Sequence, residues 1–278
     1  MTLKDNPEIG QQVAAAGIQT NYLEAGTATG TPLVLLHGSG PGVTAWANWR
    51  LAIPELSKTR RVIAPDAAGF GYTERQAGAV YNLDFWVRHI VGFLDALHIE
   101  QADLVGNSFG GALTLALATR HPERVRKIVL MGSAGTDFTL TRELDAVWGY
   151  EPSIENMRTI VETFAYDKSL LTEALVASRY EASTRPGFHE SYASMFPAPR
   201  QRHINALATP EAQLRALDKP VLLLHGREDR VIPLSSSLRL HEMLPRSELH
   251  VFGQCGHWTQ IEKRDRFVSV VDNFLSAT

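Results

Sequence analysis

A serine between two glycines, set in a strand–turn–helix pattern, constrains this chain more than any other feature. The motif Gly-x-Ser-x-Gly spans residues 106–110 and centres on Ser108. A β-type run at 102–106 precedes it, and an apolar, helix-forming run at 111–120 follows it. In a nucleophile elbow such a sharp turn holds the serine hydroxyl at the end of a sheet, and the glycines let strand and helix approach closely. The pattern predicts Ser108 as a nucleophile; the alternative is a glycine-rich turn whose serine only caps the helix.

The composition of the 278-residue chain is that of an ordinary globular protein. Hydrophobic residues make up 44% and charged residues 21%. The net charge is −3, so the sequence does not have the excess of basic residues that would predict binding to nucleic acid. The single cysteine, Cys255, excludes an internal disulfide and fits a reducing compartment. The N-terminus carries no apolar leader run, and no run is long enough to span a bilayer. We expect a soluble cytoplasmic protein with no membrane partner.

Continuous apolar runs predict the strands of a mostly parallel sheet. A hairpin is expected first, at 11–25, and the later runs lie at 33–36, 61–65, 102–106, 127–131, 219–226 and 248–252. Helical patterns separate these runs, and residues 43–57 and 260–276 are each expected to form one helix. The alternation favours a doubly wound α/β sheet. Right-handed crossovers then gather the loops that follow the strands at one edge.

The strand–helix alternation stops at about residue 136 and resumes at about 213. Between these points the pattern is helical, and five prolines divide it. We predict a helical lid, residues 136–212, inserted over the strand edge of a core made of residues 1–135 and 213–278. The alternative is a helical extension packed elsewhere on the core.

A serine hydroxyl needs a base to take its proton, and the base needs an orienting carboxylate. Two strands remain after the helical stretch. The loop after the first carries Glu228 and Asp229, and the loop after the second carries His257. The order serine, acid, histidine is the order of the α/β-hydrolases. His257 is the predicted base; Asp229 is favoured as the acid over Glu228, and Asp137 is a more distant candidate.

Two backbone N–H groups are expected to stabilise the oxyanion. One belongs to Phe109, the residue after the nucleophile. The other belongs to Ser39, in the glycine-rich loop 37–42 that follows a predicted strand. The glycines of this loop suggest a phosphate cradle as an alternative, but the P-loop spacing and its Gly-Lys-Ser/Thr ending are absent.

Metal and redox chemistry find no support in the sequence. Cys255 lies two residues before His257, where a buried structural thiol is expected rather than a redox group. His37 and His225 each end a strand, but neither has partners at ligand spacing. We therefore expect no metal and no cofactor.

Four segments share the motifs of one enzyme family: 37–48, 106–111, 226–229 and 250–258. Through them, and over residues 10–276, the chain resembles the α/β-hydrolase superfamily and, within it, the bacterial meta-cleavage-product hydrolases. A general esterase would match the elbow and little else. The segments 146–150 and 185–191 resemble the branch that acts on monocyclic, alkyl-substituted or unsubstituted products, the 2-hydroxymuconic semialdehyde hydrolase type.

The resemblance implies hydrolysis of a carbon–carbon bond in a ketonic substrate. The substrate would be a 2-hydroxy-6-oxohexa-2,4-dienoate from aromatic degradation, cleaved between C5 and C6 to 2-hydroxypenta-2,4-dienoate and a carboxylic acid. It implies Ser108, Asp229 and His257 as the triad, with His257 moving protons as the enol becomes a ketone and again during hydrolysis. A carboxylesterase with the same triad is the alternative function. A ligand-binding protein on the same scaffold is a third.

The resemblance also implies substrate contacts. Arg185 matches the family's lid arginine, whose guanidinium suits the carboxylate and 2-oxygen of the substrate; the alternative is a surface arginine before a proline. Polar contacts are expected from Gly40, Asn48, Asn107 and Trp258. Four apolar residues are expected to line the acyl pocket: Ala134, Trp148, Ile204 and Val231. The alternative is that they are ordinary residues of the hydrophobic core. The dienoate is the expected small-molecule partner, and a homo-oligomer, dimer or larger, is implied.

Overall fold

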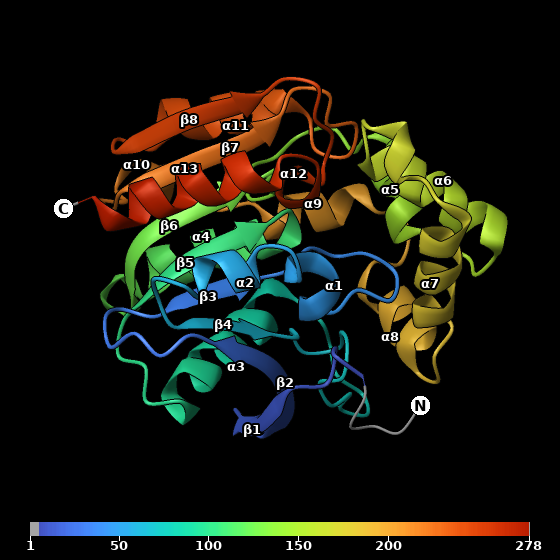
Figure 1. Cartoon of the computed structure of the whole chain (residues 1–278), viewed down its shortest axis with the longest axis horizontal. Coiled ribbons are helices and arrows are strands. Elements are labelled where there is room, and N and C mark those ends of the chain that lie inside the picture. The colour runs from blue at the N-terminus through green and yellow to red at the C-terminus, as the bar shows by residue number, and fades with distance from the viewer. Residues whose placement is uncertain (1–5, 278) are drawn as a thin grey trace.

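The structure, a computed structural model, describes residues 6–277 and is built on one eight-stranded sheet (Figure 1). The strands are Gln11–Ala15 (β1), Ile18–Ala25 (β2), Leu33–Leu36 (β3), Val62–Pro65 (β4), Ala102–Asn107 (β5), Val125–Met131 (β6), Val221–Gly226 (β7) and Ser247–Phe252 (β8). Their order is β1-β2-β4-β3-β5-β6-β7-β8. β1 and β2 pair antiparallel at one edge, and all pairs from β4 to β8 are parallel. The predicted hairpin and mostly parallel, doubly wound sheet are confirmed.

The central strands are buried on both faces. Every residue of β3, β4, β5 and β7 is buried, which explains why their sequences are continuous apolar runs rather than alternating ones. Successive side chains of β3 enter different clusters: Leu33 and Leu35 pack in one, Val34 and Leu36 in the other. The sheet therefore separates two hydrophobic cores, each covered by helices.

Helices cover both faces of this sheet. One core is covered by Ala45–Trp49 (α1), Ile53–Leu56 (α2) and Arg264–Ser276 (α13), with Thr259–Glu262 (α12) just before α13. The other is covered by Leu83–Ala96 (α3), Phe109–Arg120 (α4) and Leu234–Met243 (α11). No helix in the part of the chain that the structure describes is long and apolar enough to cross a membrane.

Two of the predicted helices are interrupted. The helix predicted at 43–57 is the pair α1 and α2. Pro54 lies in the first turn of α2 and has no N–H to bond the carbonyl of Arg50, four residues earlier, so one helix cannot run through this segment. The helix predicted at 260–276 is the pair α12 and α13, since Lys263, with φ −125° and ψ 33°, leaves the helical region between them.

Residues 136–212, between β6 and β7, contain helices and no strand. These are Arg142–Trp148 (α5), Ile154–Phe164 (α6), Lys168–Leu170 (η3), Glu173–Ser183 (α7), Phe188–Met195 (α8), Gln201–Leu207 (α9) and Glu211–Arg215 (α10). Side chains of Thr141, Ser153 and Thr172 cap the N-termini of α5, α6 and α7. In Figure 1, α5 to α8 lie together at one side of the sheet. We call α5–α10 the lid helices; a lid domain with the boundaries 136 and 212 stays a prediction.

Candidate active site

Ser108 lies on a sharp turn between β5 and α4. Its φ of 52° and ψ of −113° are unusual for a residue with a side chain and mark a strained backbone. A Cβ on Gly106 would lie 2.4 Å from the Gly110 carbonyl oxygen, and a Cβ on Gly110 would lie 2.2 Å from that of Leu36. Glycine is therefore needed at both positions for α4 to pack against the sheet, as the motif predicts.

His257 and Asp229 form a buried, hydrogen-bonded pair. Nδ1 of His257 lies 2.7 Å from Oδ2 of Asp229. The other carboxylate oxygen accepts hydrogen bonds from the backbone N–H groups of Val231 at 2.8 Å and Ile232 at 3.0 Å. Burial raises the pKa of Asp229, but His257, His225 and the backbone hydrogen bond from Ile232 together hold the pKa below its ordinary value. The pair is thus arranged as an ionised carboxylate that orients an imidazole.

The other two candidate acids face elsewhere. Glu228 accepts a hydrogen bond from the backbone N–H of Cys255 at 3.0 Å and pairs with Arg227. Asp137 pairs with Arg239 at 2.7 Å on the surface. Asp229 is therefore the candidate that the structure brings to His257.

Gly132, at the end of β6, escaped the sequence analysis. Its φ is +48°, and a Cβ there would lie 3.0 Å from Oδ2 of Asp229 and 3.2 Å from Nδ1 of His257. The available signal was a glycine directly after a buried strand, at the edge where the catalytic loops meet. A side chain at this position would displace the carboxylate or the imidazole.

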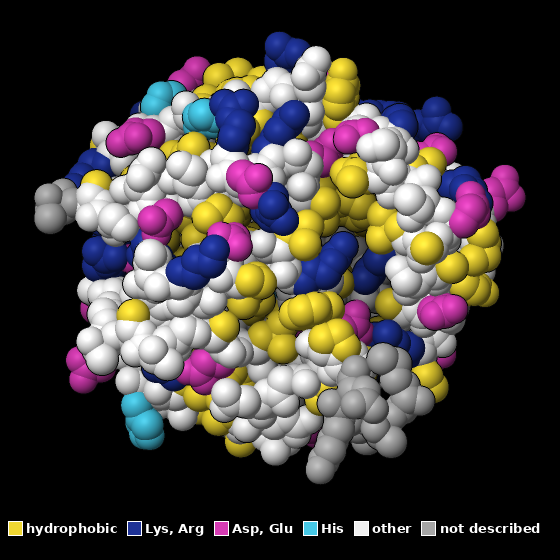
Figure 2. Space-filling view, viewed as in Figure 1, with side chains coloured by type: hydrophobic (Ala, Val, Ile, Leu, Met, Phe, Trp, Pro, Cys, Tyr) yellow, Lys and Arg dark blue, Asp and Glu magenta, His cyan; other side chains and the backbone are white. Residues whose placement is uncertain are grey.

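A cavity of about 220 Å³ lies between the core and the lid helices. Ser108 and His257 line it, together with five residues predicted to contact substrate or oxyanion: Ser39, Gly40, Asn48, Asn107 and Trp258. The opposite wall is apolar and comes from α6 and α7, through Met157, Ile160, Val161, Phe164 and Leu175. Figure 2 shows the molecule hollowed between these elements, with apolar and basic side chains at the hollow.

The loop after β3 is held by hydrogen bonds from three directions. Asn48 accepts a bond from the Gly38 N–H at 3.2 Å, and His37 accepts one from the Ala67 N–H at 2.9 Å. Burial lowers the pKa of His37 to about 4, so its ring is neutral. The Trp148 indole, from α5, donates to the Ser39 hydroxyl at 2.9 Å. This fixes the backbone that is predicted to face the oxyanion.

The four predicted acyl-pocket residues are all buried, and none lines this cavity. Three of them contact site residues directly. The Ala134 N–H donates a hydrogen bond to the Ser108 carbonyl at 3.0 Å. The Val231 N–H donates to the Asp229 carboxylate, and the Trp148 indole donates to the Ser39 hydroxyl. Ile204 lies in α9 without such a contact. Their role in binding an acyl group stays a prediction.

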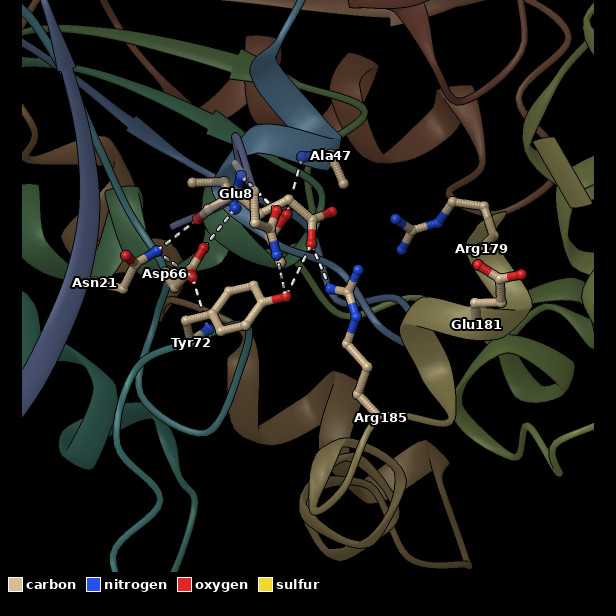
Figure 3. Close-up of polar contacts among 12 residues, drawn as sticks. Glu8, Asn21, Ala47, Asp66, Tyr72, Arg179, Glu181 and Arg185 are labelled. Carbon is tan, nitrogen blue, oxygen red and sulfur yellow. Dashed lines mark hydrogen bonds and ion pairs between the residues drawn. The ribbon is translucent and has the colours of Figure 1, made fainter. Parts of the chain in front are cut away.

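Arg185 lies outside the set of residues that line the cavity. It follows the end of α7, pairs with Glu8, and lies over the Tyr72 ring, 5.4 Å from its centroid (Figure 3). Its charge is matched by the Glu8 carboxylate in this structure. The predicted contact between Arg185 and the substrate stays a prediction.

Arg179 lines the cavity instead. It projects from α7, donates to the Pro41 carbonyl at 3.1 Å, and forms no salt bridge within residues 6–277. Burial lowers its pKa to about 10, so it stays charged near neutral pH. The missed signal was helical spacing: Arg179 follows Leu175 by four residues and shares its face of α7. Arg50, from the end of α1, lines the same cavity.

No group of three or more His, Cys, Asp or Glu side chains among the described residues is arranged to hold a metal ion. Cys255 is buried, which raises the pKa of its thiol to about 12. The residues that line the cavity include a serine, a histidine paired with a carboxylate, and two arginines.

Comparison with known proteins gives matches over nearly the whole chain. Residues 31–264 match the family described as the alpha/beta hydrolase fold. The chain is 62% identical over 273 residues to a 2-hydroxymuconate semialdehyde hydrolase of Pseudomonas sp. strain CF600, covering 98% of this chain and 96% of that one. It is 58% identical over 272 residues to a 2-hydroxy-6-oxo-2,4-heptadienoate hydrolase of Pseudomonas putida, covering 98% of both.

A solved structure is similarly close. The meta-cleavage product hydrolase from Pseudomonas fluorescens superposes with a TM-score of 0.96 at 58% identity, covering 97% of this chain and 98% of that one. The similarity therefore extends over the core and the lid helices alike.

Proposed function

The chain belongs to the alpha/beta hydrolase fold family and, within it, to the meta-cleavage product hydrolases, and on this premise we propose that it hydrolyses 2-hydroxy-6-oxohexa-2,4-dienoates. The bond cleaved is C5–C6, and the products are 2-hydroxypenta-2,4-dienoate and a carboxylic acid. The observation that carries the proposal is a single cavity that holds Ser108 and His257 together with Arg179. An elongated substrate with a reactive carbonyl and a carboxylate fits that combination of groups.

We propose Arg179, which lines the cavity, for the substrate carboxylate and 2-oxygen, and we keep Arg185, the arginine that the sequence predicts, as the alternative. A guanidinium can offer them two parallel charge-assisted hydrogen bonds. Within residues 6–277 Arg179 donates one side-chain hydrogen bond, to the Pro41 carbonyl, which leaves its other N–H groups available. Asn48, Asn107, Trp258 and Gly40 keep their proposed role as neighbours of the bound dienoate.

The first chemical step converts the enol into a ketone. Neutral His257 accepts the proton of the 2-hydroxyl group and returns a proton to C5. Asp229 stabilises the imidazolium that forms in between, because its carboxylate lies 2.7 Å from Nδ1. The resulting ketone can accept the electron pair of the C5–C6 bond.

The second step cleaves the carbon–carbon bond. His257 removes the proton from an oxygen nucleophile at Ser108, and this oxygen adds to C6. The backbone N–H groups of Ser39 and Phe109 stabilise the negative charge on the C6 oxygen. The C5–C6 bond then breaks, its electron pair moves into the ketone, and the resulting enolate takes the proton held by His257. If the nucleophile is the Ser108 hydroxyl, water then hydrolyses the acyl group on Ser108; if it is a water held at Ser108, the carboxylic acid is released directly.

The experiment that tests this function compares two substrate classes on the purified protein. We expect loss of the yellow dienoate with the 6-hydrogen and 6-methyl substrates, and slow turnover of simple esters. Rapid ester cleavage without any bleaching of the dienoates would favour the carboxylesterase instead.

We also propose that the protein is a cytoplasmic homo-oligomer. The single cysteine suits a reducing compartment, and the oligomer rests on the family resemblance alone. Light scattering of the purified chain, with a mass of 30.7 kDa per copy, measures the oligomeric state.

A further inference from the structure

A second histidine lies against the carboxylate of Asp229. His225 occupies the position before the last residue of β7, and its side chain is fully buried. Its Nε2 lies 3.5 Å from Oδ2 of Asp229. This is the same oxygen that lies 2.7 Å from Nδ1 of His257. Both imidazoles thus face the same carboxylate oxygen, but only His257 is hydrogen-bonded to it.

The hydrogen-bond partners of His225 show which of its two ring nitrogens carries the hydrogen. Nε2 lies 3.0 Å from the Ile232 carbonyl oxygen as well as facing Asp229, and both partners are acceptors only. Nε2 therefore carries the hydrogen, and Nδ1 accepts the hydroxyl hydrogen of Ser237 at 2.7 Å. Burial lowers the pKa of His225, so the ring is neutral and presents this one N–H.

Other charged groups near the pair are matched elsewhere. Glu228 pairs with Arg227, and Arg230 pairs with Glu143. The second oxygen of Asp229 is occupied by two backbone N–H groups. Among residues 6–277, His225 and His257 are the titratable side chains within 4 Å of this carboxylate. The Cys255 thiol lies close enough to interact with it, but burial raises its pKa to about 12, so it carries no charge near neutral pH.

We propose that His225 is a positioning residue that holds Asp229 and moderates its effect on His257. The Nε2–H of His225 bonds the Ile232 carbonyl, and its dipole also lies 3.5 Å from the carboxylate oxygen that faces His257. The positive end of this dipole partly offsets the carboxylate charge, so Asp229 stabilises the charged form of His257 less than it would without His225. This inference rests on the proposed function, in which His257 is the base.

The test compares His225→Leu, which removes the N–H, with His225→Gln, which keeps a side-chain N–H donor. In the leucine variant we expect kcat to fall about tenfold and the acidic limb of the kcat/KM profile to move to higher pH by about half a unit. The glutamine variant should move the limb back toward its wild-type position. An unmoved acidic limb in the leucine variant would reduce His225 to a packing residue.

A second readout does not depend on the substrate. The NMR titration of the His257 imidazole should move to higher pH in His225→Leu, even if the enzyme proves inactive on dienoates. An unchanged titration contradicts the inference, whereas missing dienoate turnover with a shifted titration contradicts only the proposed function.

Two further variants separate positioning from folding. Ser237→Ala removes the hydrogen bond to Nδ1 and should shift the acidic limb in the same direction by a smaller amount; it decides the question if the leucine variant does not fold. His89→Leu removes a buried histidine of α3 that is hydrogen-bonded to Thr20 of β2 and does not contact Asp229. It should lower stability and leave the acidic limb in place; a shift there as large as in His225→Leu would overturn the specific role of His225.

Discussion

The indole nitrogen of Trp148 lies 2.9 Å from the hydroxyl oxygen of Ser39, so a lid helix donates a hydrogen bond to the loop that follows β3. The Trp148 ring also stacks on Phe196, with centroids 4.5 Å apart and planes 3° from parallel. The loop proposed to stabilise the oxyanion is thereby held by α5 as well as by the core.

This contact predicts a specific effect of Trp148→Phe. Phenylalanine keeps the stacking on Phe196 but cannot donate to Ser39, so kcat/KM should fall about fivefold, the equivalent of about 1 kcal/mol. The matched control is Trp49→Phe, because the Trp49 indole nitrogen is buried without a hydrogen-bond partner in the described structure. Steady-state kinetics of both variants check the prediction; equal losses would show that the indole bond to Ser39 is unimportant.

The two arginines of the α7–α8 region should differ sharply in kinetics. Arg179→Gln should raise KM for the dienoate and lower kcat/KM by roughly 10- to 100-fold, because a charge-assisted contact to the carboxylate is lost. Arg185→Gln should change kcat/KM less than about threefold, since it breaks a partly exposed pair with Glu8 and a contact with the Tyr72 ring, both made by a residue that does not line the cavity. If Arg185→Gln were the more damaging variant, the carboxylate contact would be assigned to Arg185, as the sequence predicts.

Buried neutral histidines predict acid sensitivity. Burial lowers the pKa of His89 from about 6.5 to about 4. Because the folded-state pKa is depressed, the stabilisation is complete above pH 6.5 and is lost as the pH falls toward 4. His89 alone should account for about 2 kcal/mol of stability lost between pH 7 and 5.

Urea unfolding of His89→Gln measures this contribution. Glutamine can keep a hydrogen bond to Thr20 without titrating, so the variant should lose less stability than the wild type over the same pH interval. The same pH dependence in both proteins would show that His89 is not the responsible group.

The sequence predicted the elbow, His257 and Asp229 because strand order alone brings the loops after parallel strands to one edge. It did not predict Arg179, because the face of α7 that lines the cavity depends on how the lid helices pack on the core. Gly132 was missed for a related reason: its need for glycine arises from the Asp229–His257 pair, more than 90 residues later in the chain. The break between α1 and α2 could have been predicted from Pro54, which has no N–H to bond the carbonyl of residue 50. The helical pattern of residues 43–57 led to the prediction of one continuous helix instead.

The central claim, that Ser108 carries out carbon–carbon hydrolysis, is tested most directly by stopped-flow absorbance of wild type and Ser108→Ala with 2-hydroxy-6-oxohepta-2,4-dienoate. The account predicts rapid bleaching by the wild type. It predicts that Ser108→Ala binds the dienoate but cleaves it roughly 10³-fold more slowly or worse. Cleavage by Ser108→Ala at nearly the wild-type rate, with its fold intact, would contradict the account.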